Sequence, residues 1–245
     1  MEISIHGRSI PVTAEPSVDI EVALQAPCFR QWVERLDPRF VVRSIHFQSL
    51  DIFQNGHVGF LKFRTDTVDP VGNYIPGIVN SRGGVVVILP VLMCEGKEYA
   101  VLVVQPRLPG ACFELAETPA GIIEPTAKTF RGAAAKEIEE EVGITIQEHE
   151  LVDLTPFVIK PSSRLPGVFA SPGGSDEWSR WLLYRQEVTP EKLVALHGAE
   201  TGALAEGERI TLKIVPIEDA WHEVHTATSV AIILLYLRLR AEGRL

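Results

Sequence analysis

Apolar and polar residues alternate along two stretches of the first third of the chain, which is the pattern of β-strands with one buried face. The stretches cover residues 41–53 and 57–68, and Asn55-Gly56 between them is a typical hairpin turn. Ahead of them, residues 28–36 carry aromatic and aliphatic side chains at helical spacing and predict a short helix. The chain is therefore expected to begin with a small β-rich region.

A connector rich in glycine, proline and asparagine follows at residues 73–84, and we place a domain boundary within it, near residue 80. Beyond it the pattern predicts a mixed sheet with helices packed on it. The expected strands cover 85–93 and 98–107, which form a hairpin around Glu95-Gly96-Lys97, and 112–121, 177–188 and 209–217. The expected helices are one ending at Gly143, one beginning after Thr189, and 218–224 and 227–242. We therefore predict a small β-rich domain at 1–80 and an α/β (α+β) domain at 81–245.

Composition narrows the possible partners and compartments. The formal net charge of −9 argues against a nucleic-acid surface. Three scattered cysteines show no zinc-type spacing and favour a reducing, cytoplasmic compartment. The N-terminus lacks the layout of a secretory signal, and the apolar run at 229–239 is too short to span a membrane. The final Gly243-Arg244-Leu245 faintly resembles a peroxisomal address, so an organelle stays open as the alternative.

The segment 121–144 contains an unusual concentration of acid. On a helical wheel of about 100° per residue, Glu140 and Glu141 flank Glu137 on one face, whereas Glu139 points elsewhere. Carboxylates three and four residues apart repel one another, so water or a cation must compensate. Oxygen ligands at this spacing suit a hard ion such as Mg²⁺ or Mn²⁺. The alternative is a helix face that water alone solvates, as most charge runs are.

The context of this helix favours the cation. "KEIEEEVGI", residues 136–144, follows a strand ending in "ETPAG", and the arrangement resembles the Nudix box of the Nudix hydrolases. Lys136 stands where the family has arginine, and Gly121 lies one residue further from Glu137 than the family pattern has it. Outside the box, "GFLKF", "IPGIVNSRGG", "YAVLVVQPR", "VDLTPF", "SPGGSDE" and "GERITLKIVP" resemble, in the same order, the ADP-sugar and UDP-sugar diphosphatases of that family.

The resemblance implies an α/β/α sandwich behind a small β-rich N-terminal domain that serves dimerisation, and it implies roles for individual residues. The implied metal ligands are the Ala120 carbonyl, Glu137, Glu140, Glu141 and Glu208; the implied substrate-binding residues are Arg82, Arg107, Glu177 and, near the nucleotide base, Phe47. The base that orients the attacking water stays open between Glu206 and Glu208, with Glu140 less favoured. A surface position or an ordinary turn is the alternative for Arg82, Arg107 and the loop containing Glu177.

The implied activity is Mg²⁺-dependent hydrolysis of a nucleoside diphosphate sugar to a nucleoside monophosphate and a sugar 1-phosphate, by a homodimer. Mn²⁺ is the alternative metal. The base, adenine or uracil, and the sugar stay open. Two other functions are kept as alternatives: hydrolysis of another nucleoside diphosphate derivative, and a catalytically silent module that binds a nucleotide. Release of AMP or UMP from a panel of ADP- and UDP-sugars, with and without Mg²⁺, distinguishes the implied activity from these two alternatives.

Overall fold

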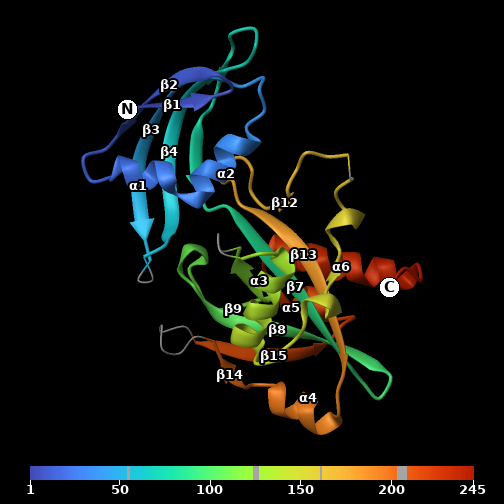
Figure 1. Cartoon of the computed structure of the whole chain (residues 1–245). Coiled ribbons are helices and arrows are strands. Elements are labelled where there is room, and N and C mark those ends of the chain that lie inside the picture. The colour runs from blue at the N-terminus through green and yellow to red at the C-terminus, as the bar shows by residue number, and fades with distance from the viewer. Residues whose placement is uncertain (54–55, 124–126, 161, 203–208) are drawn as a thin grey trace. The chain divides into compact units, whose positions relative to one another are not determined.

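The structure is a computed structural model that describes residues 1–53, 56–123, 127–160, 162–202 and 209–245 (Figure 1). Contacts divide the chain into two compact units, and each is described by itself. The first comprises Met1–Gly84 together with Ser171–Trp178, and the second comprises Val85–Ala170 together with Ser179–Leu245. The predicted boundary near residue 80 left every later residue in one domain, whereas these contacts place the short segment Ser171–Trp178 with the first unit.

The first unit is a six-stranded sheet with two short helices packed on it. Strands β3 and β4 pair antiparallel, as the predicted hairpin requires. Their inward side chains pack in one core with Phe29 of α2; they include Ile45, Phe47, Leu61 and Phe63. The strands are β1 (Glu2–Ile5), β2 (Arg8–Ala14), β3 (Val41–Ile52), β4 (Val58–Val68), β5 (Tyr74–Ile75) and β6 (Ile78–Ser81), and the helices are α1 (Ile20–Gln25) and α2 (Pro27–Arg35).

The second unit is built on a nine-stranded mixed sheet whose main path runs β11-β13-β7-β8-β15-β14. The predicted hairpin between β7 and β8 is present, and Glu95 and Gly96 adopt the positive φ angles that its two-residue turn requires. The strands are β7 (Gly84–Cys94), β8 (Lys97–Arg107), β9 (Cys112–Glu117), β10 (Ala120–Ile122), β11 (Val152–Asp153), β12 (Val168–Phe169), β13 (Trp178–Glu187), β14 (Glu200–Thr201) and β15 (Ile210–Pro216), and the helices are α3 (Phe130–Glu137), α4 (Pro190–Leu196), α5 (Ala220–Glu223) and α6 (Ala227–Ala241).

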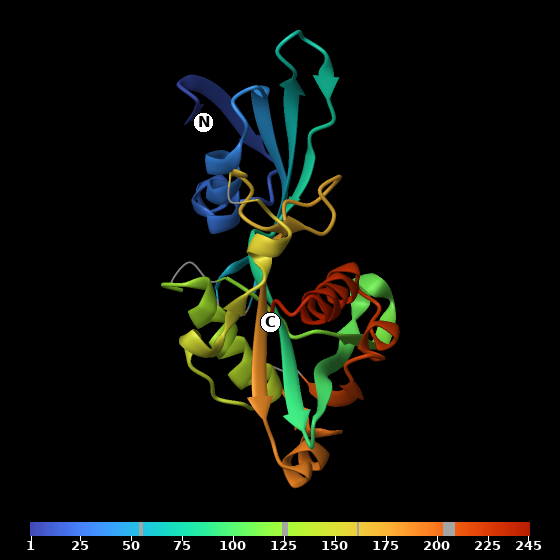
Figure 2. The same ribbon diagram turned by 90° about the vertical axis from the view of Figure 1, so that its right-hand side faces the viewer.

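Helices cover both faces of this sheet, with α3 on one side and α6 on the other (Figures 1 and 2). Strand β7 shows why: its alternate residues, Val87 and Leu89, join the α6 core, whereas Val86 and Ile88 join the α3 core. Both faces of the strand are apolar and both are buried. The predicted α/β sandwich and the β-rich N-terminal part are therefore confirmed. Within the described part of the chain, no helix is long and apolar enough to cross a membrane.

The segment predicted as one strand at 112–121 is two strands that pair with different neighbours. β9 pairs with β8, and β10 pairs with β7. Pro119 lies between them; it has no N–H to donate, and its carbonyl accepts a bond from Ile88 N at 2.9 Å. The chain thus changes partners at Thr118-Pro119, immediately before the residues that meet the acidic helix.

The C-terminal helix is fixed at its far end by Glu98, at the start of β8. Its carboxylate accepts hydrogen bonds from Tyr236 Oη at 2.8 Å and Arg240 Nη1 at 2.6 Å, and Arg185 Nη2 lies 3.3 Å away. Burial of Glu98 raises its pKa, but the bonds from Arg240 and Tyr236 and the charges of Arg240 and Arg185 outweigh burial and lower it. Burial raises the pKa of Tyr236, and its bond to Glu98 adds to the rise. The ionised carboxylate is therefore the form that the fold stabilises.

This predicts a pH-dependent stability. A carboxylate whose folded pKa is depressed contributes stability above its unfolded pKa, about 4.3 for glutamate, and loses that contribution as the pH falls through the folded pKa. Glu98→Gln should lower the free energy of unfolding at pH 7 and flatten part of its decline between about pH 5 and pH 3. Urea unfolding at a series of pH values measures both effects. Glu95→Gln, which alters an exposed carboxylate in the same hairpin, is the control; identical profiles for the two variants would exclude Glu98 as the cause.

Candidate functional site

The acidic segment is an α-helix that widens into a π-helical turn. Thr129 caps the N-terminus of α3 by accepting a bond from Gly132 N at 2.9 Å, and Ile138–Val142 then forms the π turn. Gly143 ends it, at the predicted residue, with a φ of 71° in the left-handed region that glycine favours at helix ends. Ile138 and Val142 are buried and form the apolar side of this turn. A π turn has a different angular spacing from the ideal helix, so the wheel of 100° per residue does not apply beyond Glu137.

The Glu137 carboxylate lies directly against the backbone of β10 at Gly121. A Cβ at position 121 would fall 1.8 Å from Glu137 Cδ and 1.9 Å from its Oε1, far inside any allowed contact. The φ of Gly121 is not positive, so its backbone conformation does not require glycine. Glycine is required because the carboxylate approaches the backbone so closely. The strand and the carboxylate therefore touch without a side chain between them.

The Glu141 carboxylate reaches the neighbouring residue of the same strand. Its Oε2 accepts a hydrogen bond from Ala120 N at 3.1 Å, and only 4% of the residue is exposed. The wheel places Glu141 on an open acidic face, but the π turn directs it inward. Glu137 and Glu141 thus converge on Ala120 and Gly121, which is where the predicted carbonyl ligand lies.

The π turn is also held from strand β14. Thr201 Oγ1 donates to the Glu141 carbonyl at 2.5 Å, and Gly202 N donates to the Glu140 carbonyl at 3.1 Å. These donors satisfy carbonyls at a helix end, where unpaired acceptors concentrate negative charge. The next residues along the chain include the predicted bases Glu206 and Glu208, which lie outside the described residues.

The third acid of the predicted metal set points elsewhere. Glu140 is exposed and lies 3.7 Å from Lys136 Nζ, and Glu139 accepts a bond from Thr145 Oγ1 at 3.0 Å. Among the residues that the structure describes, no three histidine, cysteine, aspartate or glutamate side chains are grouped closely enough to hold a metal ion. The structure therefore brings together Glu137, Glu141 and the main chain at Ala120, but not Glu140.

Arg107, at the end of β8, is oriented by a residue that the sequence analysis missed. Its Nε and Nη2 both lie 2.6 Å from Glu117 Oε1, and Glu117 is the last residue of β9. The Arg107 side chain is 39% exposed, so its remaining nitrogen can reach a ligand from solvent. The signal was present in the sequence, because Glu117 opens the "ETPAG" motif that leads to Ala120.

The predicted substrate residues Arg82 and Glu177 pair with each other within the first unit. Arg82 Nη1 donates to Glu177 Oε2 at 3.1 Å, and its guanidinium lies 5.3 Å from the ring centroid of Phe60. Asp176, which the sequence analysis also missed, fixes this pair. Its buried carboxylate accepts bonds from Ser81 Oγ at 2.9 Å and Arg82 N at 2.8 Å, and so ties the segment Ser171–Trp178 to β6.

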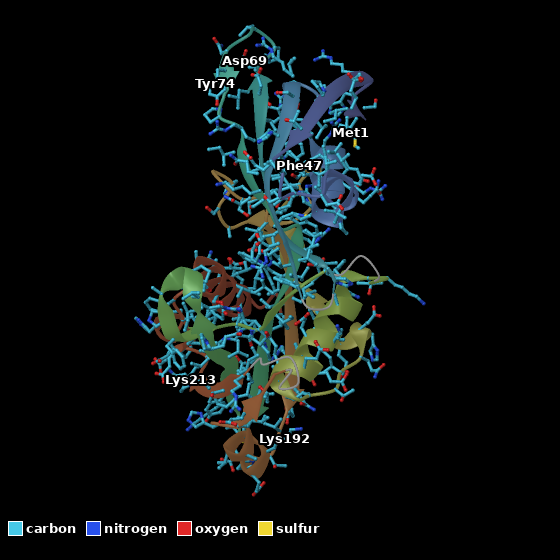
Figure 3. The ribbon with its side chains drawn as sticks, turned by 90° about the vertical axis from the view of Figure 1, so that its left-hand side faces the viewer. Met1, Phe47, Asp69, Tyr74, Lys192 and Lys213 are labelled. Atoms are coloured by element: carbon cyan, nitrogen blue, oxygen red, sulfur yellow. The ribbon has the colours of Figure 1, made fainter. Side chains whose placement is uncertain are left out.

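The predicted role of Phe47 near a nucleotide base fails. Its side chain is 0% exposed and lies in the packed interior of the first unit (Figure 3), with ring centroids 5.0 Å from Phe29 and 5.9 Å from Phe63. It alternates inward along β3 and belongs to the core, so it offers no surface to a ligand. Phe60, by contrast, is exposed, and its ring contacts the Arg82 guanidinium.

Comparison with known proteins agrees with this geometry. The NUDIX domain family model matches residues 82–234, more than half of the chain. A relative from Arabidopsis thaliana, Nudix hydrolase 14, chloroplastic, is 36% identical over 236 residues, which cover 93% of this chain and 75% of the relative. The crystal structure of an ADP compounds hydrolase superposes with a TM-score of 0.54 at 14% identity, covering 84% of this chain and 97% of that one, and shows the same fold.

The acidic helix and strand β10 both lie in the part of the chain that the family model matches. The helix carries the second half of the box motif, β10 carries the "PAG" that precedes it, and both lie within the matched residues. The chain belongs to the Nudix hydrolase family.

Proposed function

We propose that the protein hydrolyses the diphosphate of a nucleoside diphosphate sugar, an ADP-sugar such as ADP-glucose or ADP-ribose or a UDP-sugar, to a nucleoside monophosphate and a sugar 1-phosphate. As a Nudix hydrolase it belongs to a family whose members act on phosphoric anhydrides and generally use a divalent metal such as Mg²⁺. One observation carries the proposal: Glu137 and Glu141 meet the backbone of Ala120 and Gly121 with no side chain between them.

These residues suit Mg²⁺ as a cofactor. Mg²⁺ in phosphate-processing sites is held by one or two carboxylates together with water and substrate phosphates. Glu137, Glu141 and the Ala120 carbonyl would hold it, and we keep Glu140 and Glu208 as proposed further ligands. Bound there, the ion would polarise a phosphoryl oxygen and favour deprotonation of a water molecule.

The remaining proposed roles belong to the chain's own side chains. Arg107 would donate charge-assisted hydrogen bonds to the diphosphate, while Glu117 holds its guanidinium in one orientation. Arg82 and Glu177 would contact the nucleotide or sugar. Glu206 or Glu208 would orient the attacking water, with Glu140 as the less favoured base.

We propose a homodimer, with the first unit in the dimer contact, by family resemblance. The compartment is proposed to be cytoplasmic, with an organelle as the alternative; the Arabidopsis relative is named as chloroplastic. Sedimentation of the purified protein tests the first point, and microscopy of a fluorescent fusion tests the second.

The substrate class is tested with a panel. The purified full chain is incubated with ADP-ribose, ADP-glucose, UDP-glucose and UDP-galactose, with Mg²⁺ or with EDTA, and nucleoside monophosphate is quantified by chromatography. The solved structural neighbour is described as an ADP compounds hydrolase, so the adenosine compounds come first. We expect Mg²⁺-dependent release of AMP or UMP from at least one sugar nucleotide. Cleavage restricted to dinucleotides or coenzyme A would reject the sugar-nucleotide class, and binding without cleavage would indicate a silent module.

Glu141→Gln should lower turnover on the best substrate by at least about 100-fold, because the variant loses the charge of a proposed metal ligand. Glu139→Gln is the matched control, since Glu139 belongs to the same turn but faces solvent. Steady-state kinetics at saturating Mg²⁺ compare the two. Near-full Mg²⁺-dependent activity of Glu141→Gln would reject its assignment as a ligand.

Gly121→Ala should damage activity more than stability. The clashing atoms belong to the far end of the flexible Glu137 side chain, so the chain can accept the methyl group by displacing the carboxylate. We expect Mn²⁺ affinity and turnover to fall at least about 10-fold, with a melting temperature within about 4 °C of wild type. Gly110→Ala, whose Cβ would meet only Leu115 Cδ1 at 3.7 Å, is the control. A Gly121→Ala protein that melts far below wild type, or binds Mn²⁺ normally, would contradict this explanation.

A further inference from the structure

The first turn of α6 is hydrogen-bonded to the residues that connect β9 to β10. Ser229 Oγ accepts a hydrogen bond from Thr118 N at 2.9 Å, and the two hydroxyl oxygens of these residues also lie 2.9 Å apart. Both residues are almost fully buried, Ser229 at 2% and Thr118 at 1% exposed. A second hydrogen bond joins the same two parts of the chain: His225 N donates to the Ala116 carbonyl at 3.3 Å.

The hydrogen bonds of Ser229 use its full capacity. A serine hydroxyl donates once and accepts twice. Ser229 Oγ accepts from Thr118 N and from Thr226 Oγ1, the latter at 2.7 Å, so its own proton goes to Thr118 Oγ1. The hydroxyl group is thereby held in one orientation.

Helix capping does not account for this arrangement. The cap of α6 is the bond from Ser229 N to Thr226 Oγ1 at 3.3 Å, which uses the backbone of Ser229 and would survive replacement of its side chain. Alanine is also a better helix former than serine. The Ser229 hydroxyl therefore serves the segment across from the helix rather than the helix itself.

That segment carries the groups that the proposed site needs. Glu117, which orients Arg107, comes directly before Thr118, and Ala120, which meets Glu141, follows two residues later. Between them the Pro119 carbonyl is held by Ile88 N of β7 at 2.9 Å. The turn from β9 to β10 is thus fixed from β7 within the sheet and from α6 on the face opposite α3.

We propose that Ser229 is a positioning residue for the metal and diphosphate site: its hydroxyl sets the path of Thr118-Pro119 and, through it, the positions of Glu117 and Ala120. The inference rests on the proposed function of that site. Without the hydroxyl, the Thr118 N–H is buried and has lost its acceptor, and leaving such a donor unsatisfied is costly enough for the segment to shift toward another partner. Residues that orient metal ligands in this way typically affect affinity or activity 10- to 100-fold.

The test compares two hydroxyl deletions on the same helix. Ser229→Ala removes the bond to Thr118, and Tyr236→Phe, the matched control, removes the bond to Glu98 near the other end of α6. Mn²⁺ affinity is measured by electron paramagnetic resonance on the apo-protein. Amide hydrogen exchange at residues 116–121 and kcat on the best sugar nucleotide are measured alongside, at a temperature where circular dichroism shows every variant folded.

We expect Ser229→Ala to weaken Mn²⁺ binding and lower kcat by about 10-fold or more, with faster amide exchange confined to residues 116–121. Tyr236→Phe should change Mn²⁺ affinity less than about 2-fold and leave that exchange unchanged, whatever its effect on melting. Equal effects of the two variants, or normal Mn²⁺ affinity in Ser229→Ala, would overturn the proposal. Should Ser229→Ala fail to fold, Ser229→Cys, which replaces the hydroxyl acceptor of the Thr118 N–H with a weakly accepting sulfur, takes its place under the same criteria.

Failure of the proposed function gives a different result. A wild-type protein that binds Mn²⁺ but cleaves no sugar nucleotide rejects the substrate class, and the Mn²⁺ and exchange comparisons still decide the role of Ser229. A wild-type protein that binds no Mn²⁺ rejects both the metal assignment and the positioning role.

Discussion

The arrangement of the acidic turn depends on contact between carboxylates and an open backbone. Glu137 packs on the Cα of Gly121, and Glu141 accepts the N–H of the preceding residue. Acids at the C-terminal end of a helix lie at the negative end of its dipole, so this position is electrostatically unfavourable without compensation. The N–H groups of Ala120 and Gly202 and the hydroxyl group of Thr201 supply part of it. A divalent cation would supply what these dipoles cannot.

The two-sided sheet makes this contact possible. Because apolar residues cover both faces of β7, α3 is pressed against one face and α6 against the other. The strand β10 is hydrogen-bonded to β7 at the edge of this core, where the register places Ala120 opposite Val87 and Gly121 opposite Val86. Hydrophobic burial thus sets the distance between helix and strand, and the glycine permits the carboxylate to enter the gap that results.

In each unit, buried polar contacts hold the charged groups that are proposed to meet the substrate. In the second unit, the bond between the Ser229 and Thr118 hydroxyl groups and the ion pair between Arg107 and Glu117 hold two adjacent residues of the same short segment. In the first unit, Asp176 holds the pair of Arg82 and Glu177 in place by accepting hydrogen bonds from Ser81 and from the backbone of Arg82. In each case a buried polar group with satisfied hydrogen bonds fixes a more exposed charged group, and satisfied buried networks are rigid.

The sequence by itself determined the elements and the location of the acidic site. Alternation and helical spacing predict β3, β4 and α2; the turn residues predict the hairpin of β7 and β8; and Gly143 predicts the end of the acidic turn. These features are local, because a residue's backbone preference and the period of its apolar neighbours act over a few positions. The motif around Glu137 and Glu141 is local in the same sense.

Only the tertiary structure decided which distant groups meet. Asp176 contacts Ser81, and Thr118 contacts Ser229, across 95 and 111 positions of sequence. The assignment of Ser171–Trp178 to the first unit, the burial of Phe47 and the inward direction of Glu141 likewise depend on packing. A residue's type states what it can bond to, but the partner within reach is set by how the whole chain fills its core, and no local pattern encodes that.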